Sequence, residues 1–163
     1  METPEFDTPE WRELCDAKLR EWVQNDDAVQ FIHDFGHVCE LWDDLIDGDK
    51  PISHEFINDV FWILLTEMPL NPFFDQFKRN LIPLLISGIN AWLDANEYEG
   101  NGTDNELVFS YVLRDWYMEF VSFVIYLTRG REYLREVSIE VRHFFTHHET
   151  LDEYKEKIRE QRK

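Results

Sequence analysis

The sequence predicts an all-α protein, a single domain of six or seven helices that pack as a bundle or at right angles. Three observations predict this class. Apolar residues recur three and four positions apart along most of the chain, which is the spacing of an amphipathic helix. The apolar–polar alternation of a half-buried strand is not sustained anywhere in the 163 residues. A hydrophobic content of 44% is enough for a packed core in spite of the charge.

The helices can be placed in order from their apolar stripes and their capping residues. We expect helices over about 9–24, 28–48, 54–67, 72–95, 103–130 and 131–147, followed by a polar helix from Thr150. The starts are marked by Asp7 with Glu10, the run Asn25-Asp26-Asp27, Ser53, Asn71, Thr103 with Glu106, and Thr150 with Glu153. Gly48 and Gly130 are suited to end the helices that precede them.

Three segments carry more specific expectations. The run from Val60 to Leu65 is apolar on every side, so we expect it in the centre of the fold. Residues 97–105 are expected to form the longest loop, because their tip is rich in Gly and Asn. We expect residues 1–147 to form the core domain. Residues 148–163 would then form a polar terminal helix that is exposed or docked on a partner.

The net charge is strongly negative and unevenly distributed. Asp and Glu number 34 against 16 Lys and Arg, a formal charge of −18. Residues 1–128 contain 26 acidic and 7 basic side chains, whereas residues 129–163 contain 8 and 9. Such a surface repels phosphate backbones and anionic lipids, which argues against direct nucleic-acid or membrane binding. The expected partner is a basic protein surface or another protein subunit, with an oligomer as one form of such assembly.

The two cysteines and the apolar segments point to a protein of the cytoplasm. Cys15 and Cys39 form neither a disulfide framework nor a zinc pattern, and we interpret them as small core residues. The sequence begins without a basic region followed by an apolar run, as a signal peptide would have. Residues 107–127 are apolar, but three central charged residues make a membrane span costly.

The densest chemical signal is a run of carboxylates at the end of the second expected helix. Glu40, Asp44 and Asp47 follow His33 and His37 along one stripe about 80° wide. Two interpretations remain open. The stripe can be the solvated face of an amphipathic helix, opposite an apolar face formed by Phe31, Phe35, Val38, Trp42 and Leu45. Alternatively, its oxygen atoms can hold Mg²⁺ or Mn²⁺ together with a phosphorylated ligand. The metal ligands would then be Glu40, Asp43, Asp44 and Asp47.

Charged residues also interrupt the fifth expected helix, which is apolar nearly all round. Arg114, Asp115 and Glu119 would be buried there, and buried charges must be paired. Arg114 can form an internal ion pair with a neighbour of Asp115 or with an acidic residue of the second helix. In the functional alternative, Arg114 neutralises Asp44 or Asp47, or clamps an anion beside them.

Two resemblances start from the same acidic run. Asp43, Asp44 and Asp47 match the Asp-Asp-x-x-Asp pattern on a helix, and this resembles the first aspartate-rich motif of isoprenoid diphosphate synthases. That resemblance implies binding of Mg²⁺ and a diphosphate. The family's activity is not carried over, because no second aspartate-rich motif follows and the chain is shorter than the family's catalytic domain.

The second resemblance spans three segments. They are residues 41–50, the run Asn71-Pro72-Phe73-Phe74, and the run Tyr111-Val112-Leu113-Arg114. Together these segments resemble short acidic helical proteins encoded by tailed bacteriophages. This group has no assigned activity, so the resemblance implies a viral context, in the host cytoplasm or in the virion.

A second stripe of candidate ligands lies on the sixth expected helix. Glu136, Glu140, His143 and His147 fall within about 60° of one another. Glu140 and His143 also form a Glu-x-x-His pair, which di-iron bundles use on facing helices. The alternative is a solvated helix face whose histidines lie near the helix C-terminus, where the helix dipole favours cations.

The sequence therefore favours a protein without catalysis that binds or assembles with other proteins. A virion component and a host-directed inhibitor both fit the viral context. Two alternatives remain: a metal-dependent enzyme or binding protein for a phosphorylated small molecule, and an acidic mimic of nucleic acid. Neither a nucleophile elbow nor a glycine-rich phosphate loop is present in the sequence.

Overall fold

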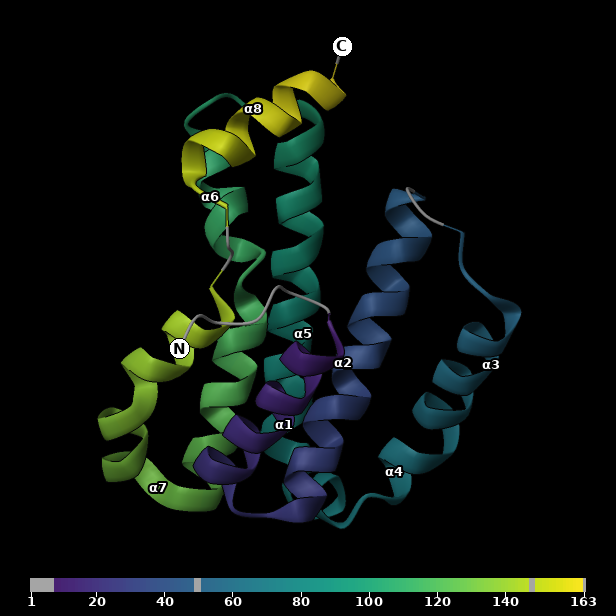
Figure 1. Ribbon diagram of the computed structural model, residues 1–163, viewed down its shortest axis with the longest axis vertical. Helices are drawn as coiled ribbons and strands as arrows, with labels where there is room; N and C mark the ends of the chain where they lie inside the picture. Colours follow the sequence, from purple (N-terminus) through teal and green to yellow (C-terminus); the bar gives the residue numbers. More distant parts are fainter. Residues whose placement is uncertain (1–7, 49–50, 147–148, 163) are drawn as a thin grey trace. The chain divides into compact units, whose positions relative to one another are not determined.

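The computed structural model describes residues 8–48, 51–146 and 149–162, and all regular structure in these ranges is helical (Figure 1). The prediction of an all-α fold is confirmed. The elements are α1 (Pro9–Val23), α2 (Asp26–Asp47), α3 (His54–Trp62), the π-helical turn η1 (Ile63–Glu67), α4 (Met68–Leu70), α5 (Pro72–Asn101), α6 (Glu106–Leu113), α7 (Trp116–Phe145) and α8 (Leu151–Gln161). Backbone contacts divide the chain into two compact units, residues 1–78 and 79–163. Within the described ranges, no helix is both long and apolar enough to cross a membrane.

Most of the predicted capping residues begin or end the helices as expected. Asn25, Ser53 and Thr150 each accept a hydrogen bond from a backbone N–H of the first turn of α2, α3 and α8. Thr103 and Glu106 exchange the hydrogen bonds of a capping box, and so do Thr150 and Glu153. Gly48 ends α2 in the left-handed conformation. Asp7 lies outside the described residues, and the side chain that caps α1 is Thr8.

The first unit is organised around α2, which contacts α1, α3, η1 and α4. Phe31 of α2 is fully buried and stacks on Phe74, with ring centroids 5.2 Å apart. Asn71 joins the start of α5 to the start of α2. Its Oδ1 accepts hydrogen bonds from the N–H groups of Phe73 and Phe74, and its Nδ2 donates to the carbonyl of Asp27 at 2.9 Å. One side chain therefore satisfies the first turn of α5 and fixes its place beside α2.

The second unit depends on a close approach of Trp116 to α5. A Cβ atom built on Gly88 would lie less than 3.0 Å from three atoms of the Trp116 ring. The ring therefore occupies the space that any larger residue at position 88 would need. Trp116 is the first residue of α7 and its ring stacks on Phe120. The glycine thus allows the start of α7 to pack directly on the α5 backbone.

Gly130 divides α7 into two helical parts. Its backbone has φ 82° and ψ 176°, a conformation that glycine adopts far more readily than other residues. The chain reverses enough to bring Arg142 within 2.6 Å of Glu119 and Tyr117 against Phe145, with ring centroids 5.9 Å apart. The predicted break at Gly130 is confirmed, although the ribbon continues across it in Figure 1.

Two boundary predictions are wrong. Residues 97–101, expected in a loop, form the last turn of α5. The helix expected over 103–130 is interrupted by a turn at Arg114 and Asp115. In both places the deciding contacts come from residues distant in sequence, because Arg162 binds the last carbonyls of α5 and Glu99 binds Arg114.

Replacing Gly88 tests the contact with Trp116. We expect Gly88→Ala to lower the free energy of unfolding by about 1–3 kcal/mol, because the added methyl group displaces the indole ring. Thermal or urea unfolding followed by circular dichroism measures the effect. Gly100→Ala is the matched control, since nothing lies within 4 Å of a Cβ at that helical position. Equal effects of the two substitutions would contradict the proposed role of Gly88.

The capping box of α8 predicts a pH-dependent contribution to stability. Hydrogen bonds from the backbone N–H and the hydroxyl of Thr150 hold the pKa of Glu153 below its ordinary value of 4.5. Because the pKa is lower in the folded state, the carboxylate stabilises the fold above pH 4.5. This contribution is lost as the pH falls through the folded-state pKa. The stability difference between the wild type and Glu153→Gln should therefore be constant above about pH 5 and shrink below 4.5. Glu160→Gln, outside the capping box, is the control, and a difference that grows in acid would refute the assignment.

Candidate functional site

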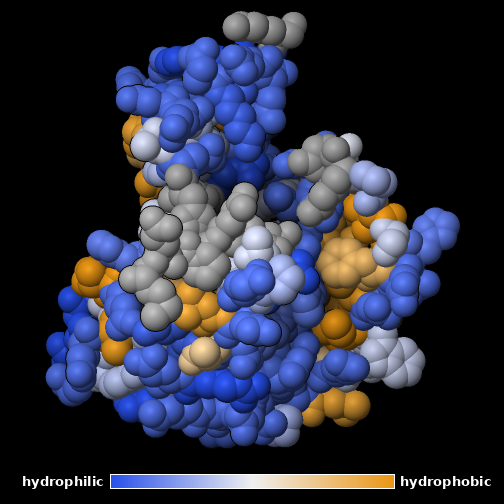
Figure 2. All heavy atoms as spheres, viewed as in Figure 1, coloured by the Kyte–Doolittle hydropathy of each residue, from blue (hydrophilic) through white to orange (hydrophobic). Residues whose placement is uncertain are grey.

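The segment expected in the centre of the fold forms an exposed apolar surface. Trp62, Leu65 and Leu70 retain 63%, 69% and 80% of their accessible surface, and Phe61 and Leu64 are exposed as well. These five residues, Phe61, Trp62, Leu64, Leu65 and Leu70, are called the α3–α4 surface below. The prediction of a central position for residues 60–65 is thus wrong. Figure 2 shows apolar residues in orange among hydrophilic ones on the side of the first unit formed by α3 and α4.

The exposure follows from how the α3–η1–α4 run packs. Val60 and Met68 are buried, and the run contacts α2. A helix with a neighbour on one side can bury only that side, so apolar residues on the other side stay in contact with water. The sequence places apolar residues on both sides of this run. The structure therefore leaves large hydrophobic side chains outside the core, which is the feature of a docking surface.

A π-helical turn lies at the centre of the α3–α4 surface. Turns of this kind are rare and are frequently found at functional sites. Two side-chain hydrogen bonds accompany it: the Thr66 hydroxyl donates to the carbonyl of Trp62 at 2.7 Å, and the Trp62 Nε1–H donates to Glu67 at 3.2 Å. The second bond orients the Trp62 indole while its ring stays exposed. A fixed aromatic ring on a surface is a common anchor in protein interfaces.

The electrostatic surroundings of this surface are acidic. Residues 51–74 include Glu55, Asp59 and Glu67 but contain neither Lys nor Arg. The whole unit, residues 1–78, has 19 acidic and 5 basic side chains, a formal charge of −14. Most of the protein's formal negative charge therefore belongs to the unit that contains the α3–α4 surface.

The inner side of α3 borders a cleft of about 560 Å³ between α1, α2 and the residues before α3. Its polar lining includes Arg12, His37, Glu40, Asp44 and Asp59, and Phe56, Val60 and Ile63 provide apolar walls. Two of the predicted metal ligands, Glu40 and Asp44, thus face one cleft. The positively charged guanidinium of Arg12 lines the same cleft as these carboxylates.

The carboxylates of α2 do not form one solvated stripe. Asp44 retains only 8% of its accessible surface, whereas Leu45, expected on the buried face, retains 53%. Glu40 and Asp43 are half-buried and Asp47 is exposed. The predicted buried face is correct for Phe31 but not for Leu45, and Asp44 instead lines the cleft together with Phe56 and Val60 of α3.

A metal site at these carboxylates receives no support. Among the described residues, no three Asp, Glu, His or Cys side chains group closely enough to hold a metal ion. The stripe on α7 gives the same result, since Glu136, Glu140 and His143 are exposed and His147 lies outside the described residues. The spacing in the sequence predicts which of these residues share a helix face. It does not predict which residues of other elements lie opposite that face.

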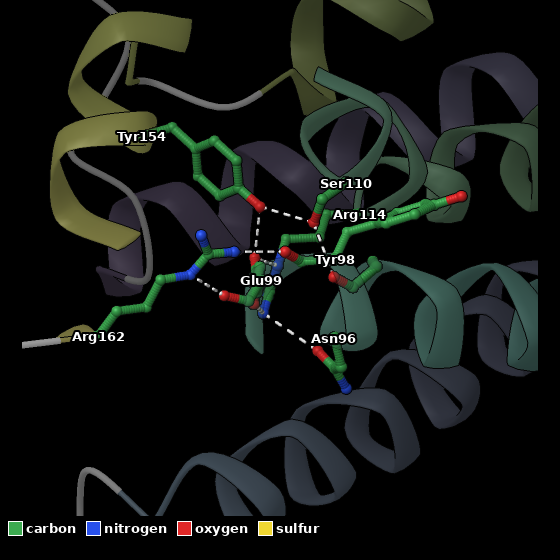
Figure 3. Close-up of polar contacts among 8 residues, drawn as sticks. Asn96, Tyr98, Glu99, Ser110, Arg114, Tyr154 and Arg162 are labelled. Carbon is green, nitrogen blue, oxygen red and sulfur yellow. Dashed lines mark hydrogen bonds and ion pairs between the residues drawn. The ribbon is translucent and has the colours of Figure 1, made fainter. Parts of the chain in front are cut away.

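Arg114 finds its partner within the second unit. Its Nη2 donates to Glu99 Oε2 at 2.5 Å, its Nε pairs with the other carboxylate oxygen, and its side chain also reaches Asn96 at 3.4 Å (Figure 3). Both side chains of the Arg114–Glu99 pair are largely buried, 20% and 14% exposed. The expectation of an internal ion pair is thus met, with Glu99 as a partner that the sequence did not single out.

Tyr154 of α8 completes this buried polar cluster. Its hydroxyl donates to Glu99 at 2.5 Å and lies 2.7 Å from Ser110 Oγ (Figure 3). The single hydroxyl proton of Ser110 can be donated to Tyr154 or to the carbonyl of Ala95, which lies 2.9 Å away. Burial and the neighbouring carboxylate raise the pKa of Tyr154 well above its ordinary value. The phenol therefore stays protonated and acts as a hydrogen-bond donor. The cluster joins α5, α6 and α8, so its role is structural.

The terminal helix α8 packs on its own chain. Tyr154 and Ile158 are buried against Leu107 of α6. Arg162 donates from all three guanidinium nitrogens to the carbonyls of Tyr98, Glu99 and Gly102, at 2.6–2.7 Å. The helix is exposed along its polar side, as expected, but its apolar edge is covered by α6 of the same chain and not by a partner.

The other two charged residues that were expected in a buried helix, Asp115 and Glu119, lie at and just after the turn between α6 and α7. Asp115 stands in the turn before α7, and Glu119 forms an ion pair with Arg142 at 2.6 Å. Both side chains of the Glu119–Arg142 pair are about half exposed. These residues stabilise the turn and the two parts of α7, and they do not converge with Arg114 on an anion site.

Comparison with protein-family models, with curated proteins and with solved structures returned no match for this chain. The functional interpretation therefore depends on the residues and their geometry alone.

Removing the charge of Glu99 tests the buried cluster. We expect Glu99→Gln to cost about 1–3 kcal/mol of unfolding free energy, because Arg114 loses its ionic partner in a largely buried place. Urea unfolding gives the value. The control is Glu156→Gln, which removes an exposed pair with Arg159 and should change stability by less than about 0.5 kcal/mol. A cost for Glu99→Gln no larger than that of the control would contradict the structural role of the cluster.

Proposed function

We propose that this chain is a protein-interaction protein without catalytic activity, and that the α3–α4 surface is its binding surface. The observation that carries the proposal is the exposure of Phe61, Trp62, Leu64, Leu65 and Leu70 on one short helical run. Monomeric proteins seldom leave so many large apolar side chains together in water unless they bind something. Tryptophan is among the residues that supply most of the binding energy of an interface, and apolar contacts around such a residue exclude water from it.

The charge around the surface defines the partner. The partner would present an apolar groove or ridge to Trp62 and Leu65 and basic residues around it. Glu55, Asp59 and Glu67 lie on the same helical run as the apolar residues, and no Lys or Arg offsets them between residues 51 and 74. Opposite charges at the rim increase the association rate and select against acidic partners. A basic protein with an apolar centre is therefore the partner class that fits.

This proposal accounts for the acidity better than the two alternatives. A metal-dependent enzyme would need grouped ligands, and the described carboxylates do not group in that way. A mimic of nucleic acid would present charge without a large apolar centre. Assembly with another subunit and inhibition of a basic target both use a surface of the kind proposed here.

A pair of designed peptides tests the proposal. Both would be amphipathic helices with the same leucine face, one flanked by Lys and Arg and the other by Glu. We expect the basic peptide to bind and the acidic one not to, in a fluorescence polarisation titration. Leu65→Glu should weaken binding of the basic peptide at least about 10-fold, because it places a charge at the centre of the surface.

The matched control is Ile139→Glu, which changes an equally exposed apolar residue in the second unit. It should leave the affinity for the basic peptide unchanged. Equal binding of the two peptides would show that charge complementarity is not involved. Equal loss in both variants would show that the α3–α4 surface is not the binding site.

A further inference from the structure

A second exposed apolar face lies on α5. Residues 80–93 contain no charged side chain, although 31% of the whole chain is charged. Ile82, Ile86, Ile89 and Leu93 of this segment are all exposed, and Ile86 retains 62% of its accessible surface. These four residues are called the α5 seam below.

The opposite side of the same helix is already used within the second unit. Leu81, Gly88, Ala91 and Ala95 are buried there, and Gly88 receives the Trp116 ring. At about 100° per residue, the centres of the two sets lie roughly 145° apart around the helix. The seam is therefore a separate apolar face, and packing within the second unit does not explain it.

The spacing of the seam identifies the kind of surface it fits. Its members are separated by four, three and four residues, which is the alternation of the two core positions in paired helices. A face with this spacing packs best against another helix with the same spacing. We propose that the seam pairs with the seam of a second copy of the chain, with the two helices antiparallel.

The seam is symmetric about its own midpoint, and this symmetry favours a second copy. A two-fold axis placed midway between Ile86 and Ile89 sets Ile82 opposite Leu93 of the other copy. The same axis sets Ile86 opposite Ile89 of the other copy, so all four residues are matched in one register. Contacts of this kind, with the same patch on both subunits, are the commonest in protein dimers.

The charges at the ends of the seam are complementary in the same arrangement. Arg79 precedes the uncharged segment, and Asp94 and Glu97 follow it. All three are exposed. Antiparallel pairing brings Arg79 of each copy to the end where the other copy has Asp94 and Glu97. A parallel pair would instead place like charges side by side, which is unfavourable in a chain of charge −18.

The size of the seam sets the strength of the dimer. Four apolar side chains from each copy form a small interface, so we expect a dissociation constant of about 1–100 μM. Sedimentation equilibrium over a dilution series spanning this range should show a shift from the 19.8 kDa chain toward twice that mass. A single monomer mass at every concentration would overturn the proposal.

Charged substitutions locate the interface. Ile86→Glu should raise the dissociation constant at least about 100-fold, because it places two like charges beside the two-fold axis. Arg79→Glu should raise the dissociation constant about 10-fold. Combining Arg79→Glu with Glu97→Arg should return the dissociation constant to the wild-type value. Leu65→Glu, on the α3–α4 surface, is the control and should leave it unchanged. Dimerisation that survives Ile86→Glu, or that is lost in Leu65→Glu, would overturn the proposal, and circular dichroism confirms that each variant is folded.

Cysteine cross-linking tests the orientation of the two helices. A mixture of Ile82→Cys and Leu93→Cys chains should form a disulfide-linked dimer under mild oxidation, and Ile82→Cys alone should not. The native thiols contribute little, since burial raises the pKa of Cys15 to about 11 and that of Cys39 to about 12. Cross-linking of Ile82→Cys chains with each other would show parallel pairing and contradict the antiparallel register.

Discussion

A helix that packs against a neighbour on one side can bury only that side, and this constraint determines where the protein is left open. The α3–η1–α4 run and α5 both have apolar residues around most of their circumference. Each uses one side within its own unit, through Val60 and Met68 in the first and through Leu81 and Gly88 in the second. The other side of each remains in water. The two exposed faces are thus a direct consequence of helices that are more apolar than their units can cover.

Charge separates the roles of these two faces. The α3–α4 surface lies in a unit of charge −14, beside acidic residues and without basic ones nearby in the sequence. The α5 seam lies in a segment without charge, bounded by Arg79 at one end and Asp94 at the other. An acidic surround repels a second acidic copy and attracts a basic partner. An uncharged seam allows two copies of an acidic chain to meet. The same net charge therefore favours a different partner at each face.

The sequence predicts the local features of the fold well and the long-range ones poorly. The predicted helix caps and the predicted helix end depend on neighbouring residues, and all are found in the structure. They are the caps at Ser53, Asn71, Thr103 and Thr150 and the end at Gly130. The ion pair of Arg114 joins two residues that are 15 positions apart in the sequence. The last turn of α5 is bound by Arg162, which follows it by about 60 residues. No local pattern distinguishes Glu99 from the other acidic residues, so these contacts had to be seen in three dimensions.

The candidate site was missed for a related reason. An apolar run with no polar side is usually central in a large fold, and this pattern predicts a central position for residues 60–65. In a small unit with few covering helices, the same run is only half covered. The presence of the uncharged run over residues 80–93 in so acidic a chain is the signal that would have suggested a second exposed face. The carboxylates of α2 illustrate the opposite error, because Asp44, expected on a solvated stripe, is buried and lines a cleft shared with α3.

Both apolar faces must be accessible to solvent in the intact chain, and carbene footprinting read by mass spectrometry measures this accessibility directly. Trp62 and Leu65 should be labelled heavily at every protein concentration, whereas the fully buried Trp22 and Phe31 should stay unlabelled. Ile86 and Ile89 should be labelled strongly in dilute solution and progressively less as the concentration rises. Protection of Trp62 to the level of Trp22 in the isolated chain would contradict the account.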